Sequence, residues 1–541
     1  MKILLEEYLK ILKEKDELDL LLCDLLLLDG YTIANRPKSG ERQYGVDVLA
    51  QKEDDTYLFI IKQKDITRDT WDSGKDSVRQ SINEVLDVYL PVMIPQSHTC
   101  KQYHIVLVTN GYILAAVQPN WVHYQNQHKT FNGIPIVFDE WTLDVLVKKC
   151  AELAFSDILF GKKNQSDLRK VLYYIDENEF DNLYYERVID CLLTQIVNAP
   201  QTQKAKHLTT FYTCAALICT WASNIQKYKI AINVSEYSII KFWQFLYKHK
   251  KFEDKTYLPF LFRLIKLYRQ YNLHYLSEVE KISNVNHAIS HANPLEDGIM
   301  VYDIVGRLAS FGLFHYFEGE REKAQKIVNT MIGFMNANPV FKYPIFDNHI
   351  IELSLAFLLL KYTGRNNDLK VLMECIVNAI KVKYYLEKKY PAPYDTYEEA
   401  LQIYFGAQLE YTASVLFAGL LEWSCIEGDS TAFDELVSFI QSDFSTTTLQ
   451  TWQMNASEEE ELYNIHAAHK AGVSIPFTGI STLEKFKENL NRADSSIDID
   501  KFSFIEYCFP SAAILSCRYF RTPVPPQFWR QAEKIQIPVK P

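Results

Sequence analysis

The sequence lacks the motifs of several large functional classes. Its ten cysteines occur without a CxxC pair, and the closest two, Cys214 and Cys219, have no second pair that would complete a zinc site. It contains no GxxxxGK[ST] phosphate-binding loop, no GxSxG motif and no GxGxxG motif after a predicted strand. Hydrolysis of a nucleoside triphosphate is therefore not expected.

Long apolar runs are also missing. The richest run, from Leu18 to Leu28, is broken by Asp19 and Asp24 and is too short and too charged to span a bilayer. The N-terminus carries acids where a secretory signal would carry basic residues. We expect no membrane association, and the scattered cysteines indicate a reducing, cytoplasmic location.

The chain has no excess of positive charge. Its 57 Lys and Arg residues are outnumbered by 68 Asp and Glu residues, which gives a formal net charge of -11. No overall basic field would attract phosphates, and this argues against a protein that coats DNA without specificity. A nuclease is not excluded, because its site binds cations through carboxylates and needs only a local basic surface.

The first 150 residues alternate between helical and extended patterns. We expect a helix over 1–28, in one or two pieces, and then strands over 31–34, 44–51 and 57–64. Further along we expect a helix over 77–89, strands over 103–109 and 134–138, and a helix over 141–153. This pattern predicts an α+β domain in which helices flank a mixed sheet.

Beyond about residue 160 the pattern becomes helical. The polar segment 162–166 indicates a boundary, so we expect the α+β domain to cover 1–160 and an all-α region to cover 161–541. Within that region we expect a long loop over 441–461, and irregular chain over 522–526 and 538–541.

Three segments of the helical region share one pattern. Each has an apolar helix, a glycine among charged residues and a second helix, and the glycines are Gly319, Gly364 and Gly428. A helix pair of this kind cannot bury its apolar face alone, so neighbouring pairs stack on one another. We therefore expect a helical-repeat array of hairpins, although the irregular spacing of the glycines matches no named repeat.

Two residues on neighbouring predicted strands are suited to phosphodiester chemistry. Asp47 follows the flexible Gly45, and Lys62 shares one strand face with Leu58 and Ile60. A lysine among apolar neighbours needs a partner, and Asp47 could supply it. Metal-dependent cleavage uses a carboxylate to hold Mg²⁺ or Mn²⁺ and benefits from a lysine beside the phosphate. The other interpretation is an ordinary cross-strand salt bridge.

Five short pieces of sequence carry a family resemblance. They are Asp29-Gly30-Tyr31, Gly45-Val46-Asp47, Ile60-Ile61-Lys62, Arg79-Gln80 and Val108-Thr109-Asn110-Gly111. Their order and the order of the predicted elements resemble the PD-(D/E)XK superfamily, especially its Mrr-type restriction-endonuclease branch, over about residues 15–150. The resemblance implies a restriction-endonuclease-like fold, Mg²⁺ or Mn²⁺ as cofactor and DNA as substrate.

The resemblance also implies roles for single residues. Asp47 corresponds to the metal-binding aspartate, Lys62 to the lysine of the motif, and Asp19 to an acid on the first helix. A helical projection places Asp19 near Leu22 and Leu26, on an apolar side of the helix. The other interpretation of Asp19 is an exposed acid, because leucines occur all round this helix.

The chain departs from the superfamily at one position. Ile60 stands two residues before Lys62, where the superfamily carries Glu, Asp or Gln. Some members move the acid to the neighbouring helix, where Glu84 is the candidate metal ligand, one turn after Gln80, which would position phosphate or water. Shifting the register to Lys64 supplies no acid either.

These features predict a metal-dependent DNA endonuclease that cleaves phosphodiesters by attack of water. Fusion of such a nuclease to a helical array resembles effectors of prokaryotic anti-phage defence. The helical region would recognise a protein partner or a trigger, or build a homo-oligomer. The alternative, which the missing acid at Ile60 favours, is a catalytically inactive nuclease fold within a helical interaction scaffold.

Overall fold

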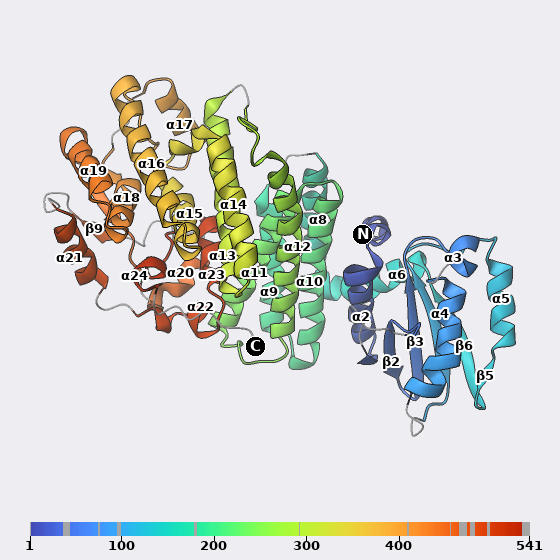
Figure 1. Cartoon of the computed structure of the whole chain (residues 1–541). Helices are drawn as coiled ribbons and strands as arrows, with labels where there is room; N and C mark the ends of the chain where they lie inside the picture. The colour runs from blue at the N-terminus through green and yellow to red at the C-terminus, as the bar shows by residue number, and fades with distance from the viewer. Residues whose placement is uncertain are drawn as a thin grey trace. The chain divides into compact units, whose positions relative to one another are not determined.

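In the computed structural model the chain forms two compact units, Met1–Val234 and Ser235–Pro541 (Figure 1). The structure describes residues 2–35, 44–73, 76–94, 99–177, 181–290, 293–407, 411–454, 456–464, 473–475, 482–494 and 498–532. Among these residues, no helix is both long enough and apolar enough to cross a membrane.

The first unit is built on a mixed sheet, as the sequence predicts, and the sheet has six strands where five were expected, because Thr130–Phe131 adds a short one. The strand order is β1-β2-β3-β4-β6-β5. Strands β1 to β3 are antiparallel neighbours, β4 is parallel to both β3 and β6, and β5 is antiparallel to β6. The strands are β1 (Thr32–Asn35), β2 (Val48–Lys52), β3 (Asp55–Lys62), β4 (Tyr103–Thr109), β5 (Thr130–Phe131) and β6 (Ile134–Trp141).

Helices and helical turns surround this sheet and continue beyond it. Those up to β6 are α1 (Lys2–Ile11), η1 (Glu14–Leu18), α2 (Asp19–Leu28), α3 (Arg68–Asp72), α4 (Val78–Glu84), η2 (Val85–Met93) and α5 (Gln118–Gln127). Those after β6 are α6 (Leu143–Lys149), η3 (Cys150–Ala154), α7 (Asp157–Phe160), α8 (Lys162–Asp176), α9 (Asn182–Asn198) and α10 (Gln201–Asn224). Helices α8 to α10, which follow the predicted boundary, belong to the first unit.

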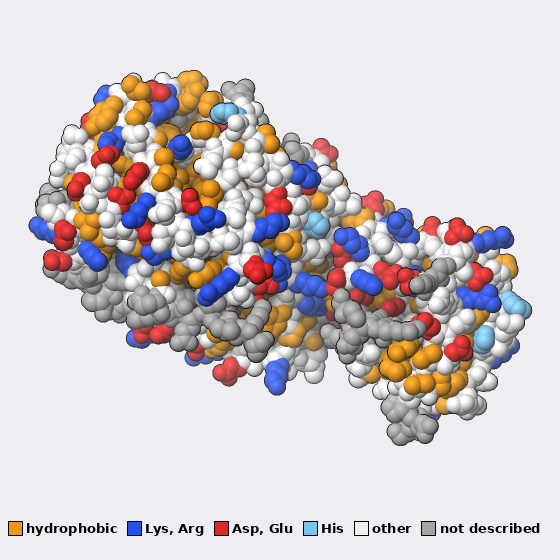
Figure 2. All heavy atoms as spheres, in the orientation of Figure 1, with side chains coloured by type: hydrophobic (Ala, Val, Ile, Leu, Met, Phe, Trp, Pro, Cys, Tyr) orange, Lys and Arg blue, Asp and Glu red, His pale blue; other side chains and the backbone are white. Residues whose placement is uncertain are grey.

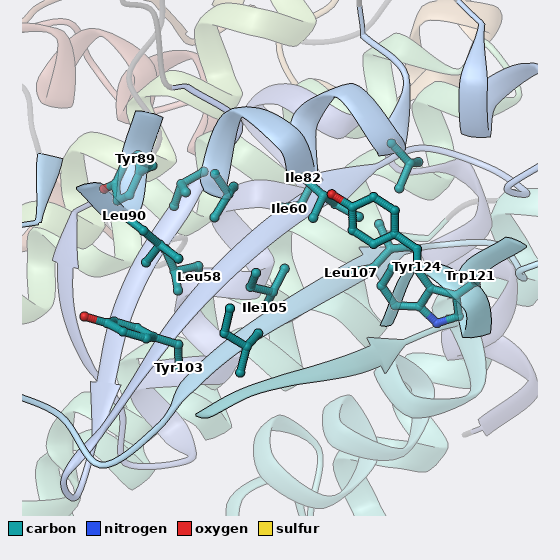
Figure 3. Packing of buried hydrophobic residues seen from close by; sticks show 14 of the residues in the cluster. Leu58, Ile60, Ile82, Tyr89, Leu90, Tyr103, Ile105, Leu107, Trp121 and Tyr124 are labelled. Atoms are coloured by element: carbon teal, nitrogen blue, oxygen red, sulfur yellow. The ribbon is translucent and has the colours of Figure 1, made fainter. Parts of the chain in front are cut away.

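One face of the sheet packs against α4, η2 and α5 (Figure 3). Leu58 and Ile60 of β3 and Ile105 of β4 point into this layer, because alternate residues of a strand share a face. Ile82 of α4 and Trp121 of α5 cover them, and all five side chains are buried. Within this layer Ile60 has no surface exposed to solvent.

The other face of β3 carries Phe59. Its ring contacts Trp141 and Tyr31, with ring centroids 5.2 and 6.2 Å apart. Consecutive residues of β3 therefore enter two separate apolar layers, and a charged side chain can reach solvent only near the end of the strand. Lys62 is that last residue.

The hairpin and the segment 162–166 differ in detail from the prediction. Strand β2 begins at Val48, so Asp47 precedes the strand instead of lying within it. Lys64 lies beyond β3, with a φ of 67°. The first helix has one of its two expected forms, in two pieces, α1 and α2, separated by the turn η1. The polar segment 162–166 begins α8 and is not a linker.

The second unit is mainly helical. It begins within α11 (Tyr228–Lys248), and its other longer helices are α12 (Leu258–Ile282), α13 (Pro294–Phe317), α14 (Arg321–Ala337), α15 (Ile350–Tyr362), α16 (Asn366–Glu387), α17 (Tyr397–Tyr404), α18 (Val415–Ile426), α19 (Ser430–Asp443), α21 (Leu483–Asp494) and α23 (Ser511–Phe520). Its short turns are η4 (Pro339–Lys342), η5 (Asp347–His349), η6 (Ala456–Glu458), α20 (Glu459–Leu462), η9 (Ile499–Lys501), α22 (Ser503–Glu506) and α24 (Gln527–Arg530). A small sheet has the order β7 (Ala413–Ser414), β8 (Thr448–Thr451), β9 (Val473–Ile475).

The three predicted helical hairpins are confirmed. Gly319 lies between α13 and α14, Gly364 between α15 and α16, and Gly428 between α18 and α19. Their φ angles are 76°, 74° and 64°, a left-handed conformation that glycine adopts without steric cost and that commonly ends helices.

One of the two segments expected to be irregular contains regular structure. The segment 441–461 contains β8, whereas 522–526 forms no helix or strand, as expected, and its residues are buried within the second unit. Beyond them, Arg530 of α24 pairs with the buried Glu422 of α18, with 2.6 Å between Nε and Oε1. This part of the chain is anchored by burial and by charge. Residues 538–541 lie outside the described part of the chain.

The turn at Gly364 provides a test of the hairpin fold. A Cβ at this position would meet no atom within 4 Å, so the cost of Gly364→Ala is the left-handed backbone alone. We expect Gly364→Ala to lower the free energy of unfolding by about 1 kcal/mol. Gly364→Asn should cost less, because asparagine tolerates this conformation. Urea denaturation followed by circular dichroism measures both, and equal losses would contradict the assignment.

Candidate functional site

Asp47 occupies the open end of the β2–β3 ladder. Its backbone N–H donates to the carbonyl of Phe59 at 2.9 Å, and its Oδ2 accepts the N–H of Ile61 at 2.7 Å. The side chain thus replaces the backbone carbonyl that a longer β2 would have offered to Ile61. No described residue donates a hydrogen bond to the other carboxylate oxygen, Oδ1.

Gly45 brings the chain into this position. Its φ is 81°, and a Cβ on it would lie 2.1 Å from the carbonyl oxygen of Ser81 in α4. Any other residue would clash with the backbone of α4 and would also be strained. The Gly45-Val46-Asp47 sequence therefore fixes the position of Asp47 beside β3.

The electrostatic surroundings of Asp47 are unfavourable to its charge. Burial, with smaller contributions from the carboxylates of Glu14 and Asp19, outweighs the lowering effects of the Ile61 N–H and Lys62 and raises the pKa of Asp47 from 3.8 to about 6. At neutral pH the folded protein carries Asp47 charged in a place that disfavours the charge. An asparagine could accept the same hydrogen bond without this cost, so the aspartate is more typical of a functional residue than of a structural one.

The two neighbouring acids come from the break between α1 and α2. Lys15 has an extended backbone and Asp16 has a φ of 69°, so the helix is interrupted within η1. Glu14 lies before this interruption and Asp19 opens α2, where its exposure is only 9%. The interpretation of Asp19 as an exposed acid is therefore wrong. Asp24 of the same helix is buried as well.

Sequence reasoning missed Glu14. The signal was present, because Glu14 and Glu17 flank a cluster of charges between two leucine-rich segments. A continuous buried helix would not accommodate these charges, so they mark a break. The backbone conformation at Asp16 decides which acid faces the sheet. No local sequence pattern specifies that conformation.

Lys62 lies near Asp47 without a direct ion pair. Its charge lowers the pKa of Asp47, but among the described residues no carboxylate oxygen lies within 4.0 Å of its ammonium group. It is the last residue of β3, opposite Thr109 of β4, and is partly exposed. The simple salt-bridge interpretation is thus not what the structure has. The ammonium group can still reach an anion at the end of the sheet.

The residues predicted on α4 are less closely associated with Asp47. Glu84 is partly buried at the end of α4, and it is not among the charges that act most strongly on Asp47. Gln80 is exposed. Ile60 is fully buried in the apolar layer of Figure 3, so an acid at this position would face Ile82 and not solvent.

The fit of this site to a divalent cation can be judged from its donors. Among the described residues, no group of three or more His, Cys, Asp or Glu side chains could hold a metal ion. Mg²⁺ keeps several waters, however, and is commonly bound by one or two carboxylates together with substrate phosphates. Oδ1 of Asp47 and the carboxylate of Asp19 fit that lesser requirement, and a cation would relieve the repulsion between them.

The surface charge does not point to an extended phosphate-binding surface. Figure 2 shows Lys and Arg side chains interspersed with Asp and Glu on the face in view, in keeping with the net charge of -11. Any phosphate contact must then be local.

Comparisons with protein families, with curated proteins and with solved structures found no match for this chain.

The raised pKa of Asp47 gives a pH-dependent prediction. Between about pH 4 and pH 6 the folded state holds a proton on Asp47 that the unfolded state has lost, so stability falls as the pH rises through this window. Asp47→Asn removes the effect and should be more stable than the native protein at pH 7, by about 1–3 kcal/mol. Urea denaturation of both proteins from pH 4 to pH 7.5 measures the difference. A difference that does not change with pH would contradict the assignment.

Proposed function

We propose that the first unit is a metal-dependent DNA endonuclease. The observation that carries this proposal is the position of the Asp47 carboxylate near Glu14, Asp19 and Lys62. Its negative charge in this place lowers the stability of the fold. The observed order of elements supports the restriction-endonuclease-like interpretation. It runs helix, strand, hairpin with Asp and Lys, helix and parallel strand, which is the order expected from the sequence. The fold supports the proposal at the level of a mixed sheet flanked by helices.

Each residue of the site has a distinct role in this proposal. Asp47 and Asp19 hold Mg²⁺ or Mn²⁺ through carboxylate oxygens, and the Ile61 N–H orients the Asp47 carboxylate. The cation, when bound, supplies Lewis-acid activation of water and phosphate. Lys62 places a positive charge where negative charge develops on the phosphate. Glu14 adds negative charge that strengthens cation binding.

A second candidate function rests on Ile60. This position normally supplies an acid in the superfamily that the sequence resembles, and here it is an apolar residue with no access to solvent. An inactive nuclease fold that serves as part of a helical interaction scaffold would have no need of the acid. The two functions differ in whether the Asp47 site binds a metal and cuts DNA.

The helical second unit supports a role in recognition. Its hairpins offer repeated surfaces on which a protein partner, a trigger or a second copy of the chain can bind. A nuclease joined to such an array is the arrangement expected of an anti-phage defence effector that is held inactive until its trigger binds. This part of the proposal rests on analogy with the domain arrangement.

Cleavage of supercoiled plasmid DNA with Mg²⁺ or Mn²⁺ tests the leading proposal. We expect Asp47→Ala and Lys62→Ala each to reduce the rate of nicking by about 100-fold or more, because the first removes a metal ligand and the second removes the positive charge beside the phosphate. Asp54→Ala and Lys101→Ala are matched controls, because these residues form an exposed ion pair in the chain just before β3 and β4 of the same unit. Both controls should retain the native rate.

Two outcomes would count against this proposal. Nicking that survives both Asp47→Ala and Lys62→Ala would rule out the site. No nicking with either metal, together with no Mn²⁺ binding by calorimetry, would favour the inactive scaffold.

The second metal ligand can be identified by Mn²⁺ titration. We expect Asp19→Asn and Glu14→Gln each to weaken Mn²⁺ binding by about tenfold, because both carboxylates act on Asp47. Glu84→Gln should leave the affinity unchanged. Isothermal titration calorimetry measures all three variants without requiring cleavage. Loss of binding in Glu84→Gln alone would move the second ligand to α4.

A further inference from the structure

The second unit contains a cavity of about 170 Å³ that is separate from the Asp47 site. It lies where the start of α13, the chain after η4, the end of α16 and helix α17 meet. Two backbone hydrogen bonds fix this junction, from Ala392 N–H to the Ile345 carbonyl and from Asp347 N–H to the Ala392 carbonyl, both at 2.8 Å. The walls are therefore held by main-chain pairing.

Most of the cavity wall is apolar. Six side chains form its floor, namely Leu295, Val340, Ile345, Ala392, Ala400 and Ile403. All of these except Val340 are buried. A cavity of about 150 Å³ suffices for one benzene ring, so this space accepts a single ring or a short aliphatic chain. An apolar lining of this size favours a ligand whose main part is small and apolar.

The polar groups of the lining are nearly all donors. The lining residues with polar side chains are two lysines, Lys383 and Lys389, and three tyrosines, Tyr343, Tyr390 and Tyr404, and all of them can donate hydrogen bonds. No described residue forms a hydrogen bond with the Tyr343 hydroxyl. No carboxylate belongs to the lining. A ligand group placed against these donors must therefore be an acceptor, and a negative charge fits best.

The two lysines are held in place by their neighbours. Glu387 bonds both of them, Lys383 at 2.7 Å and Lys389 at 3.0 Å. The Lys389 ammonium also lies 4.6 Å from the centre of the Tyr404 ring. Two positive charges share one negative charge, so the group keeps one net positive charge at the cavity. This arrangement complements an anion with a single charge.

We propose that this cavity binds a small monocarboxylate with an aromatic or short aliphatic body. The body fills the apolar floor, and the carboxylate accepts hydrogen bonds from Lys383, Lys389 and Tyr343. The proposal is independent of the nuclease proposal, because every residue in it belongs to the second unit. It gives the helical region a ligand of defined chemistry.

Calorimetry with the full chain tests the charge requirement. The probe is 3-phenylpropanoate, and its uncharged counterpart is 3-phenylpropanamide, which has the same ring and chain length. We expect the carboxylate to bind at least about tenfold more tightly than the amide, because hydrogen bonds to a charged group are stronger. Equal affinities, or no binding of the carboxylate at millimolar concentration, would overturn the proposal.

Three variants locate the binding site. Lys389→Met should weaken binding of 3-phenylpropanoate by about tenfold, and Ala400→Trp, which fills the cavity, should abolish it. Lys381→Met is the matched control, because Lys381 lies on α16 two residues before Lys383 but pairs with Glu435 at 2.8 Å and does not line the cavity. Circular dichroism shows that each variant is folded. Native affinity in Lys389→Met and Ala400→Trp, or an equal loss in Lys381→Met, would place the ligand elsewhere and overturn the proposal.

Discussion

The hydrogen bond from the Ile61 N–H to Asp47 Oδ2 fixes the geometry on which the rest of the site depends. It forms where β2 has ended and β3 continues, so a side chain takes the place of a backbone acceptor. One carboxylate oxygen is used in the fold, and Oδ1 is left for another partner. The neighbouring charges of Glu14 and Asp19 make the arrangement costly unless a cation or a proton balances it.

The sequence predicts the framework of the first unit well because its strands are apolar and bounded by turns. Strand β4 spans Tyr103–Thr109, as predicted, since its run of branched apolar residues is buried on both faces. The ends of the hairpin were harder to predict. Gly45 approaches α4 so closely that it delays the start of β2, and this contact is formed by residues far apart in the sequence.

The site itself was only partly predictable. The GVD and Lys62 positions follow from local sequence, whereas the choice between Asp19, Glu14 and Glu84 depends on how helices are placed against the sheet. The break at Asp16 decides that choice in favour of the N-terminal helices. The burial of Ile60 shows why an acid at that position cannot simply be restored, because it would enter a closed apolar layer.

The second unit shows a similar division between local and distant information. Glycines at the hairpin turns can be read from the sequence, but the ion pairs that anchor the C-terminal part cannot. Arg518 pairs with Glu236 and Arg521 with Glu352, across 282 and 169 residues of chain. Burial raises the pKa of Glu352 to about 6, and Arg521 opposes this effect. Buried pairs of this kind favour one arrangement of the helices over others.

The central claim is that Asp47 holds a divalent cation. Anomalous diffraction from crystals soaked in Mn²⁺ tests it most directly, because the signal locates the metal whether or not DNA is cleaved. The account predicts an anomalous peak about 2.1 Å from Asp47 Oδ1, with Asp19 as a second ligand. A fully occupied Mn²⁺ elsewhere in the first unit, with none at Asp47, would contradict it.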